Sequence, residues 1–372
     1  MKRAKVIGAG IALGVLLMAL SCGEEKKEKD YHTTLPSSLH GTTRGMEYWY
    51  MDGMFHITSI QYADLNCKSC HAEGCATCHD VNDKGEPVIT ATSKEKDQNT
   101  CFGCHGRHKT LNKIMANMGT SDVHAQKGMK CGDCHTGREI HGDGKTWDTL
   151  LEAGFFDTKC ENCHKIDSLP KNTEHSMHAG KTLDCQACHV KTVVSCYNCH
   201  FNAEILHEKK VAYGPMANFV LLVKNKEGKI TSGTIMSIDY VTDLNNVEAS
   251  TKTFLAVAPY YAHSITSAGR TCSDCHNNPA VQEYNEKGKI TLTYWDGDEE
   301  SGKIKNKTGV IPYAKKGALE VIFARPKDPS AAPSCSEQGC MYPEWVTIGT
   351  KIDLEHSVGE PLGDEVMKKL SK

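Results

Sequence analysis

The sequence predicts a fold of short α-helices and loops wrapped around bound prosthetic groups, followed by a small β-rich C-terminal region. Three observations lead to this prediction. A Cys-x-x-Cys-His pentapeptide occurs eight times between residues 67 and 276. Apolar residues make up only 39% of the chain and aromatic residues 7%, which is little material for one large protein core. After residue 211, apolar runs alternate with turn signals, a pattern typical of strands.

The repeated pentapeptide is the attachment signal for c-type haem. Two thiols one helical turn apart reach the two vinyl groups of a porphyrin, and the next histidine then lies under the iron as an axial ligand. Random placement of the cysteines and histidines would give only about 0.05 copies. The cysteines expected to attach haem are Cys67, Cys70, Cys75, Cys78, Cys101, Cys104, Cys131, Cys134, Cys160, Cys163, Cys185, Cys188, Cys196, Cys199, Cys272 and Cys275. The expected first axial ligands are His71, His79, His105, His135, His164, His189, His200 and His276.

Other interpretations of paired cysteines explain the pattern less well. A zinc ribbon does not require a histidine after each Cys-x-x-Cys pair. A thioredoxin-like motif occurs singly and near a βαβ pattern. Disulfide bonds would not place a histidine after every second cysteine. The motif therefore favours haem attachment.

With eight such motifs, the chain resembles multihaem c-type cytochromes, and specifically octahaem ones, over residues 67 to 276. The resemblance implies eight covalently attached haem c groups that act as the core of a loop-rich fold. A weaker resemblance, based on the haem count, links the chain to enzymes of the octahaem tetrathionate reductase and hydroxylamine oxidoreductase type. Some of those enzymes use a Cys-x-x-Cys-Lys motif, which this sequence lacks. Outer-surface electron-conduit cytochromes are similar in haem density.

The N-terminus has the pattern of an export signal. Residues 1 to 21 combine a basic start, with Lys2, Arg3 and Lys5, and an uncharged apolar run. The run ends at Cys22, which resembles a bacterial lipoprotein processing site, with plain signal cleavage as the alternative. Residues 22 to 45 are polar and predict a flexible tether. We therefore expect an exported protein, periplasmic or on the outer surface, anchored to a membrane through a lipidated Cys22.

Residues 46 to 210 are expected to form an array of seven haem groups. Each motif is predicted to lie on a short helix, joined to the next by Gly- and Pro-containing loops. Similar segments precede two motifs, with His124 ahead of Cys131 and His178 ahead of Cys185. Each of these histidines is expected to bind the iron of a different haem from the one attached just after it.

Residues 211 to 372 are expected to form the β-rich region, which carries the eighth haem at residues 272–276. Strands are predicted at residues 219–223 and 229–240, with a turn at 225–228 and further strands within 281–325. Cys335 and Cys340 predict a disulfide. Met follows Cys340 where a haem motif would need histidine, and closely spaced cysteines in an exported protein commonly form a disulfide. Residues 364–372 predict a short exposed helix.

Eight histidines outside the motifs match the eight second axial ligands that the irons require. His32 and His40 lie in the expected tether and His356 lies late in the chain, so they are set aside. The remaining candidates are His56, His108, His124, His141, His175, His178, His207 and His263. An iron held by two histidines passes electrons but has no open position for a substrate.

These observations favour an electron carrier over an enzyme, and we identify no catalytic residue in the sequence. The expected partners are other redox proteins, such as cytochromes and quinol-linked or outer-membrane electron-transfer components, and further copies of the chain. The formal net charge of −3 gives no indication of a nucleic-acid partner. Two alternatives remain: a reductase of nitrite, hydroxylamine or tetrathionate with one open haem, and a subunit of a polymeric cytochrome wire.

Overall fold

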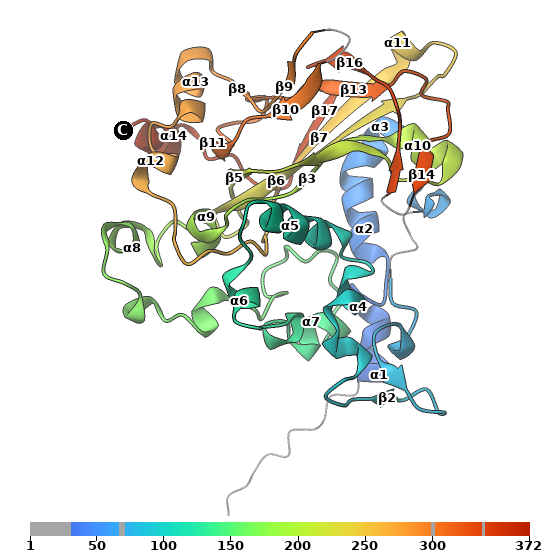
Figure 1. The fold of residues 1–372 in the computed structure, drawn as a ribbon, viewed down its shortest axis with the longest axis vertical. Helices are drawn as coiled ribbons and strands as arrows, with labels where there is room; N and C mark the ends of the chain where they lie inside the picture. The colour runs from blue at the N-terminus through green and yellow to red at the C-terminus, as the bar shows by residue number, and fades with distance from the viewer. Residues whose placement is uncertain (1–30, 67–70, 299–301, 337–338) are drawn as a thin grey trace, which may run out of the picture.

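The computed structural model describes residues 31–66, 71–298, 302–336 and 339–372. Helices account for 33% of the residues and strands for 24%. The fold has two parts that meet along one face of a central sheet (Figure 1). Short helices and loops from the first half of the chain lie on that face, and the C-terminal strands build the sheet and cover its other face. The C-terminal region is therefore rich in sheet, but it is larger than the small region expected.

Among the described residues, the first part contains nine short α-helices. They are α1 (Tyr31–Thr34), α2 (Arg44–Trp49), α3 (Phe55–Thr58), α4 (Gln98–Phe102), α5 (Gly106–Asn117), α6 (Val123–Gln126), α7 (Gly137–His141), α8 (Thr173–His178) and α9 (Cys185–His189). Most of them are joined by turns, whereas α2 and α3 are continuous through a π-helical stretch at Tyr50–Met54. Side chains cap several of them, because a short helix leaves most of its terminal N–H groups without partners. Asp97, Asp122 and Asn172 accept hydrogen bonds from the first turns of α4, α6 and α8.

Residues 31–45 differ from the flexible tether that the sequence predicts. Ser38 is buried, and the Arg44 guanidinium donates hydrogen bonds to the carbonyl oxygens of Trp147 (2.8 Å) and Ser37 (2.7 Å). The contact with Trp147 ties this segment to a residue far along the chain. Residues 1–30, which include the expected signal and Cys22, lie outside the described residues. In the part of the chain that the structure describes, no helix is both long and apolar enough to cross a bilayer.

The central sheet has seven strands. They are β3 (Ser195–His200), β4 (Ala212–Met216), β5 (Phe219–Lys224), β6 (Ile230–Val241), β7 (Thr251–Pro259), β11 (Gly309–Pro312) and β17 (Leu354–Ser357). The hairpin predicted around residues 225–228 corresponds to β5 and β6, which pair antiparallel. Its turn uses Gly228 at φ 76°, a conformation that favours glycine. One edge of β6 pairs with β7 along its length, and the other edge pairs first with β5 and then with β3.

Smaller elements cover the far face of the sheet and the ends of the molecule. The two-stranded pairs are β1 (Asp80–Val81) with β2 (Pro87–Val88), β8 (Ile290–Thr291) with β12 (Leu319–Glu320), β9 (Thr293–Asp296) with β10 (Lys303–Asn306), β13 (Phe323–Pro326) with β16 (Trp345–Gly349), and β14 (Ser334–Ser336) with β15 (Gly339–Met341). The remaining helices are α10 (Phe201–His207), α11 (Val247–Ser250), α12 (Cys272–Cys275), α13 (Pro279–Lys287) and α14 (Asp364–Leu370). Met367 and Leu370 are buried, so α14 packs on the fold and is not the exposed helix expected.

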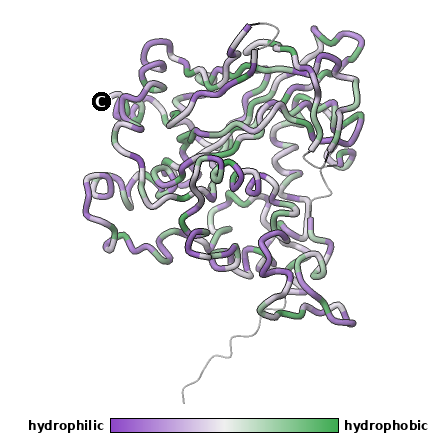
Figure 2. Tube along the Cα trace, viewed as in Figure 1, coloured by the Kyte–Doolittle hydropathy of each residue, from purple (hydrophilic) through white to green (hydrophobic). Residues whose placement is uncertain are grey.

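The sheet has a hydrophobic core of its own, which the low apolar content did not predict. Leu221, Val223, Ile235, Leu255 and Val257 are almost completely buried in one large cluster. Hydrophobic residues follow the sheet strands, whereas the helical part is more polar (Figure 2). Full burial of one such side chain contributes about 1.5–3 kcal/mol. The apolar residues are therefore concentrated in the C-terminal half, which leaves the N-terminal half with few of them.

Candidate haem-binding sites

Six of the described motifs lie on single helical turns, as the sequence predicts. The turns begin near residues 75, 101, 131, 160, 185 and 272. In five of them the histidine N–H donates to the carbonyl oxygen of the first cysteine, at 2.8 to 2.9 Å. This bond closes the turn and brings the two cysteines and the histidine to one side, which is the arrangement that one porphyrin needs.

Each of these six motif histidines faces a second histidine from elsewhere in the chain. The ring centroids are 5.8 to 6.5 Å apart. The pairs are His79 with His141, His105 with His40, His135 with His263, His164 with His124, His189 with His175, and His276 with His178. Histidine rings in direct contact lie closer together, as His108 and His263 do at 4.3 Å.

The separation within the pairs fits an iron between two imidazoles. A bond from a metal to an imidazole nitrogen is about 2 Å long, and the ring centre lies about 1 Å behind the nitrogen, so two such rings are roughly 6 Å apart. Among the described residues, His, Cys, Asp and Glu form no cluster of three that could hold a bare metal ion. The donors occur as pairs, which suits a group that supplies the other four ligands itself.

In seven of these twelve histidines Nδ1 is held by another group, which leaves Nε2 for a metal. Among the motif histidines, Nδ1 of His189 contacts the Thr266 carbonyl oxygen and Nδ1 of His276 contacts the Lys369 carbonyl oxygen, both at 2.9 Å. Carboxylates and carbonyls also contact Nδ1 of His79, His124, His135, His141 and His175. Metal-binding histidines use the same arrangement, because the second bond fixes the tautomer and the ring orientation.

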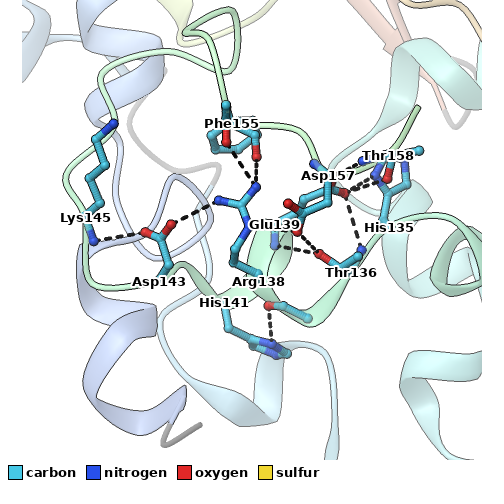
Figure 3. Close-up of polar contacts among 12 residues, drawn as sticks. His135, Thr136, Arg138, Glu139, His141, Asp143, Lys145, Phe155, Asp157 and Thr158 are labelled. Atoms are coloured by element: carbon cyan, nitrogen blue, oxygen red, sulfur yellow. Dashed lines mark hydrogen bonds and ion pairs between the residues drawn. The ribbon is translucent and has the colours of Figure 1, made fainter. Parts of the chain in front are cut away.

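Glu139 is the centre of the most elaborate of these networks (Figure 3). Its Oε2 lies 2.9 Å from His135 Nδ1, and its Oε1 accepts the backbone N–H groups of Asp157 and Thr158. Burial alone would raise the pKa of the Glu139 carboxyl, but the bonds from Thr158 and His135 outweigh it and lower the pKa. Glu139 is therefore a carboxylate at neutral pH, and it fixes His135 against the loop at residues 155–158.

Two of the second histidines, His40 and His263, have a lowered pKa although both lie at exposed positions. Desolvation by the surrounding groups, and next the neighbouring His105, lowers the pKa of His40 to about 4. Desolvation, and next His108, lowers the pKa of His263 to about 4. Both side chains are neutral at pH 7, and a neutral imidazole offers the lone pair that a metal requires.

The first motif is only partly described, because Cys67 and Cys70 lie outside the described residues. Its histidine, His71, lines a cavity of about 420 Å³ together with His32. The Cys75 Sγ of the next motif is 3.9 Å from His32 Nδ1. The structure thus brings His32 to the site of the first motif, although the sequence placed it in a tether.

The motif at residues 196–200 differs from the others, because it lies on strand β3 and not on a helical turn. Asn198 has φ 52°, and the pairing with β6 shifts register between Cys196 and Cys199. His200 is completely buried, with Nδ1 2.7 Å from Asp239 Oδ2 and Nε2 3.3 Å from the Pro329 carbonyl oxygen. Burial raises the pKa of the Asp239 carboxyl, and the bond from His200 opposes this effect. The ring beside His200 is that of Tyr342, at 5.6 Å, and not that of a histidine.

Five of the eight candidate second ligands lie opposite a motif histidine, and three do not. Those that do are His124, His141, His175, His178 and His263. His124 and His178 face motifs other than the ones that follow them in sequence.

His56, His108 and His207 have other surroundings. His56 is exposed beside Phe55, His108 stacks on His263, and His207 Nε2 lies 3.1 Å from the Ser330 carbonyl oxygen. His40 was not a candidate in the sequence because it lies in a polar, charged segment. Its place opposite His105 depends on contacts between residues far apart in the chain, which no local pattern reveals.

The motif cysteines lie next to those of neighbouring motifs, in sequence order. Cys101 and Cys131 share a side-chain hydrogen bond, and so do Cys160 and Cys185. In three further neighbouring pairs one thiol is close enough to contribute to a raised pKa of the other: Cys104 acts on Cys78, Cys163 on Cys134, and Cys188 on Cys275. The six helical motifs therefore form one continuous row.

The last two cysteines form a disulfide in the structure, Cys335–Cys340, which joins β14 to β15. It lies away from the row of motifs. Comparisons with protein-family models, with curated proteins and with solved structures found no match to this chain.

Proposed function

We propose that this chain is an exported multihaem c-type cytochrome that carries electrons between redox partners. The observation that carries the proposal is the set of six histidine pairs, each made of one motif histidine and one distant histidine at a separation that fits one iron. Bound haem would supply one-electron oxidation and reduction at each of these sites.

The residues of the chain would fix each site for electron transfer and not for substrate binding. Each pair of histidines would hold one iron from both sides and would leave no position for a substrate. The Nδ1 contacts of His79 and His135 to carboxylates would favour the oxidised iron, because an anionic partner makes imidazole a stronger donor. Carbonyl partners, as for His189 and His276, do so less strongly. The potentials would then differ along the row.

The row of neighbouring cysteines supports an electron path that follows the sequence. It would run through the motifs that begin at residues 75, 101, 131, 160, 185 and 272. The first motif, at 67–71, would extend the path at its N-terminal end, because only three residues separate it from the second. Redox proteins that bind near α1 or near α12 could donate to the path or accept from it. The export signal and Cys22 would place the protein outside the cytoplasm and tether it to a membrane.

One set of measurements on the mature protein tests this function. Intact mass gives the number of covalent haem groups, a redox titration gives reversibility, and low-temperature EPR gives the spin state of each iron. We expect covalent haem, reversible reduction over a range of potentials, and mainly low-spin iron. A protein that carries no covalent haem, or whose iron is mainly high-spin, would contradict the proposal.

A further inference from the structure

The motif at residues 196–200 lies inside the central sheet and not at its edge. Strand β3, which carries the motif, has β4 on one side and β6 on the other, and both motif cysteines pair with residues of both neighbours. The N–H group of His200 donates to the Val211 carbonyl oxygen at 2.9 Å. In five of the helical motifs the same group closes the turn onto the first cysteine. The motif therefore forms sheet in place of the turn that a haem site needs.

The side chains of this motif divide between the two faces of the sheet. Cys199 pairs with Ile238 of β6, and His200 pairs with Asp239. Paired residues share a face, whereas neighbours along a strand point to opposite faces. Cys199 packs against the apolar cluster that joins α2 and α3 to the sheet, and the ring of His200 lies beside that of Tyr342. A porphyrin attached through Cys199 would therefore lie on the opposite face from the imidazole that should bind its iron.

The ring of His200 also has no nitrogen to offer to a metal. The ring is completely buried, with Nδ1 2.7 Å from Asp239 Oδ2 and Nε2 3.3 Å from the Pro329 carbonyl oxygen. A carbonyl oxygen only accepts hydrogen bonds, so Nε2 carries a proton and has no free lone pair. Nδ1 faces a carboxylate that is itself completely buried. Both nitrogens are therefore committed to partners within the protein.

Asn198 and His200 instead connect the sheet to the elements that cover its far face. Asn198 lies at φ 52°, and its side chain accepts the Ala324 N–H group at 3.1 Å and donates to the Ala324 carbonyl oxygen. It also donates to Asp239 at 3.2 Å, which links it to His200. Ala324 belongs to β13, and Pro329 belongs to the loop that follows β13. Two residues of the pentapeptide thus hold β13 and its loop on β3 and β6.

We propose that the Cys196–His200 motif carries no haem and is a structural part of the sheet, in which Cys196 and Cys199 remain thiols. The inference rests on the proposed function and deepens it, because it sets the number of haem groups at seven, one for each of the other motifs. A haem attached to these two cysteines and a β3 strand seated between β4 and β6 exclude each other. The electron path described above does not pass through this motif.

Peptide mapping of the mature holoprotein tests the inference. The protein is denatured, reduced, alkylated and cut with trypsin, whose cleavage after Lys181, Lys191 and Lys209 separates the motif at 185–189 from the motif at 196–200. The peptide 192–209 should carry two alkyl groups and no haem. The peptide 182–191 is the matched control and should carry one haem and no alkyl group. Intact mass should give seven haem groups.

Two variants test the inference in the folded protein. Replacing Cys196 and Cys199 by Ser should leave the haem count and the low-temperature EPR spectrum unchanged, whereas replacing Cys185 and Cys188 by Ser should remove one haem. His200→Ala should lower the melting temperature, because it leaves a buried carboxylate without its partner, and should change neither the haem count nor the spectrum.

The outcomes separate this inference from the proposed function. Haem on the peptide 192–209, or the loss of one haem in the variant without Cys196 and Cys199, would overturn the inference alone. If His200→Ala fails to fold, the peptide map of the unaltered protein still decides. A mature protein without any covalent haem would instead overturn the proposed function.

Discussion

His40 lies in a polar segment, but its ring lies opposite that of His105, with the centroids 6.1 Å apart. His56 was the stronger candidate in the sequence, yet its neighbouring ring is that of Phe55 and not that of a motif histidine. The two side chains therefore make a matched pair for testing which histidines bind iron.

Replacing His40 by Ala should remove the second axial ligand of one iron. The expected result is an unchanged haem count and one additional high-spin iron in the low-temperature EPR spectrum, because the motif histidine His105 remains. His56→Ala is the control and should leave the spectrum as it is. A high-spin signal in the His56 variant, and none in the His40 variant, would reverse the assignment.

Glu139 provides a second prediction at the scale of one residue. Glu139→Gln would turn an amide N–H₂ toward His135 Nδ1 or toward the N–H groups of Asp157 and Thr158, so one buried donor would lose its partner. We expect a loss of about 1–3 kcal/mol in the free energy of unfolding and a higher potential at the 131–135 site. Urea unfolding and a redox titration measure the two effects. Asp148→Asn, at an exposed side chain, should change neither.

At the scale of single elements, α13 offers a test of pH dependence. Glu283 on this helix accepts a hydrogen bond from Thr291 Oγ1 at 2.9 Å and lies 2.9 Å from Lys307 Nζ. Burial alone would raise the pKa of Glu283, but these partners outweigh it and hold the pKa below its usual range. A lowered pKa in the folded state contributes stability above the unfolded pKa of about 4.3, and this contribution is lost as the pH falls through the folded pKa.

Glu283→Gln should therefore destabilise the protein by about 1 kcal/mol at pH 7, and the difference from the wild type should shrink as the pH falls below about 4. Urea unfolding at several pH values measures this difference. Glu286→Gln, at an exposed position of the same helix, should match the wild type throughout. A difference for Glu283→Gln that stayed constant down to acid pH would exclude the lowered pKa as its cause.

The hairpin of β14 and β15 tests the assignment of the last two cysteines. Replacing Cys335 and Cys340 by Ser opens a loop of six residues, which the chain-entropy model values at about 2 kcal/mol. We expect a lower melting temperature and an unchanged haem count, measured by calorimetry and intact mass. Loss of a haem from this variant would mean that the pair attaches one.

The sequence was informative where local chemistry decides the structure. The spacing of the motifs predicted single helical turns, and the apolar run at 219–223 with the turn signal at 225–228 predicted the hairpin of β5 and β6. It was less informative where contacts between residues far apart in the chain decide the structure. The 196–200 motif lies on a strand because it pairs with β4 and β6, both of which follow it in the chain. The pairing partner of each motif histidine is equally a long-range property.

At the scale of the whole molecule, the two halves differ in what holds them together. The sheet half has its own apolar core, whereas the helical half buries few large side chains, such as Leu111, Met115, Trp147 and Phe155. In the proposed holoprotein the haem groups would supply the missing apolar surface there. The sheet should therefore fold without haem, and the region of residues 71–180 should not.

Hydrogen exchange of the chain produced without haem attachment would test this difference. Amides of β5, β6 and β7 should stay protected, while those of α4, α6, α7 and α8 should exchange quickly. The mature protein is the control and should protect both halves. Strong protection of the helices without haem would show that protein contacts alone order them.

The histidine pairs also differ in when they can form along a chain that is made from its N-terminus. His40 with His105, His79 with His141, His124 with His164, and His175 with His189 all lie within the first 189 residues. His135 and His178 must wait for His263 and His276, which follow strand β7. These two pairs would be the last to form, and they would join the helical half to the segment that follows β7, before β11 and β17 complete the sheet.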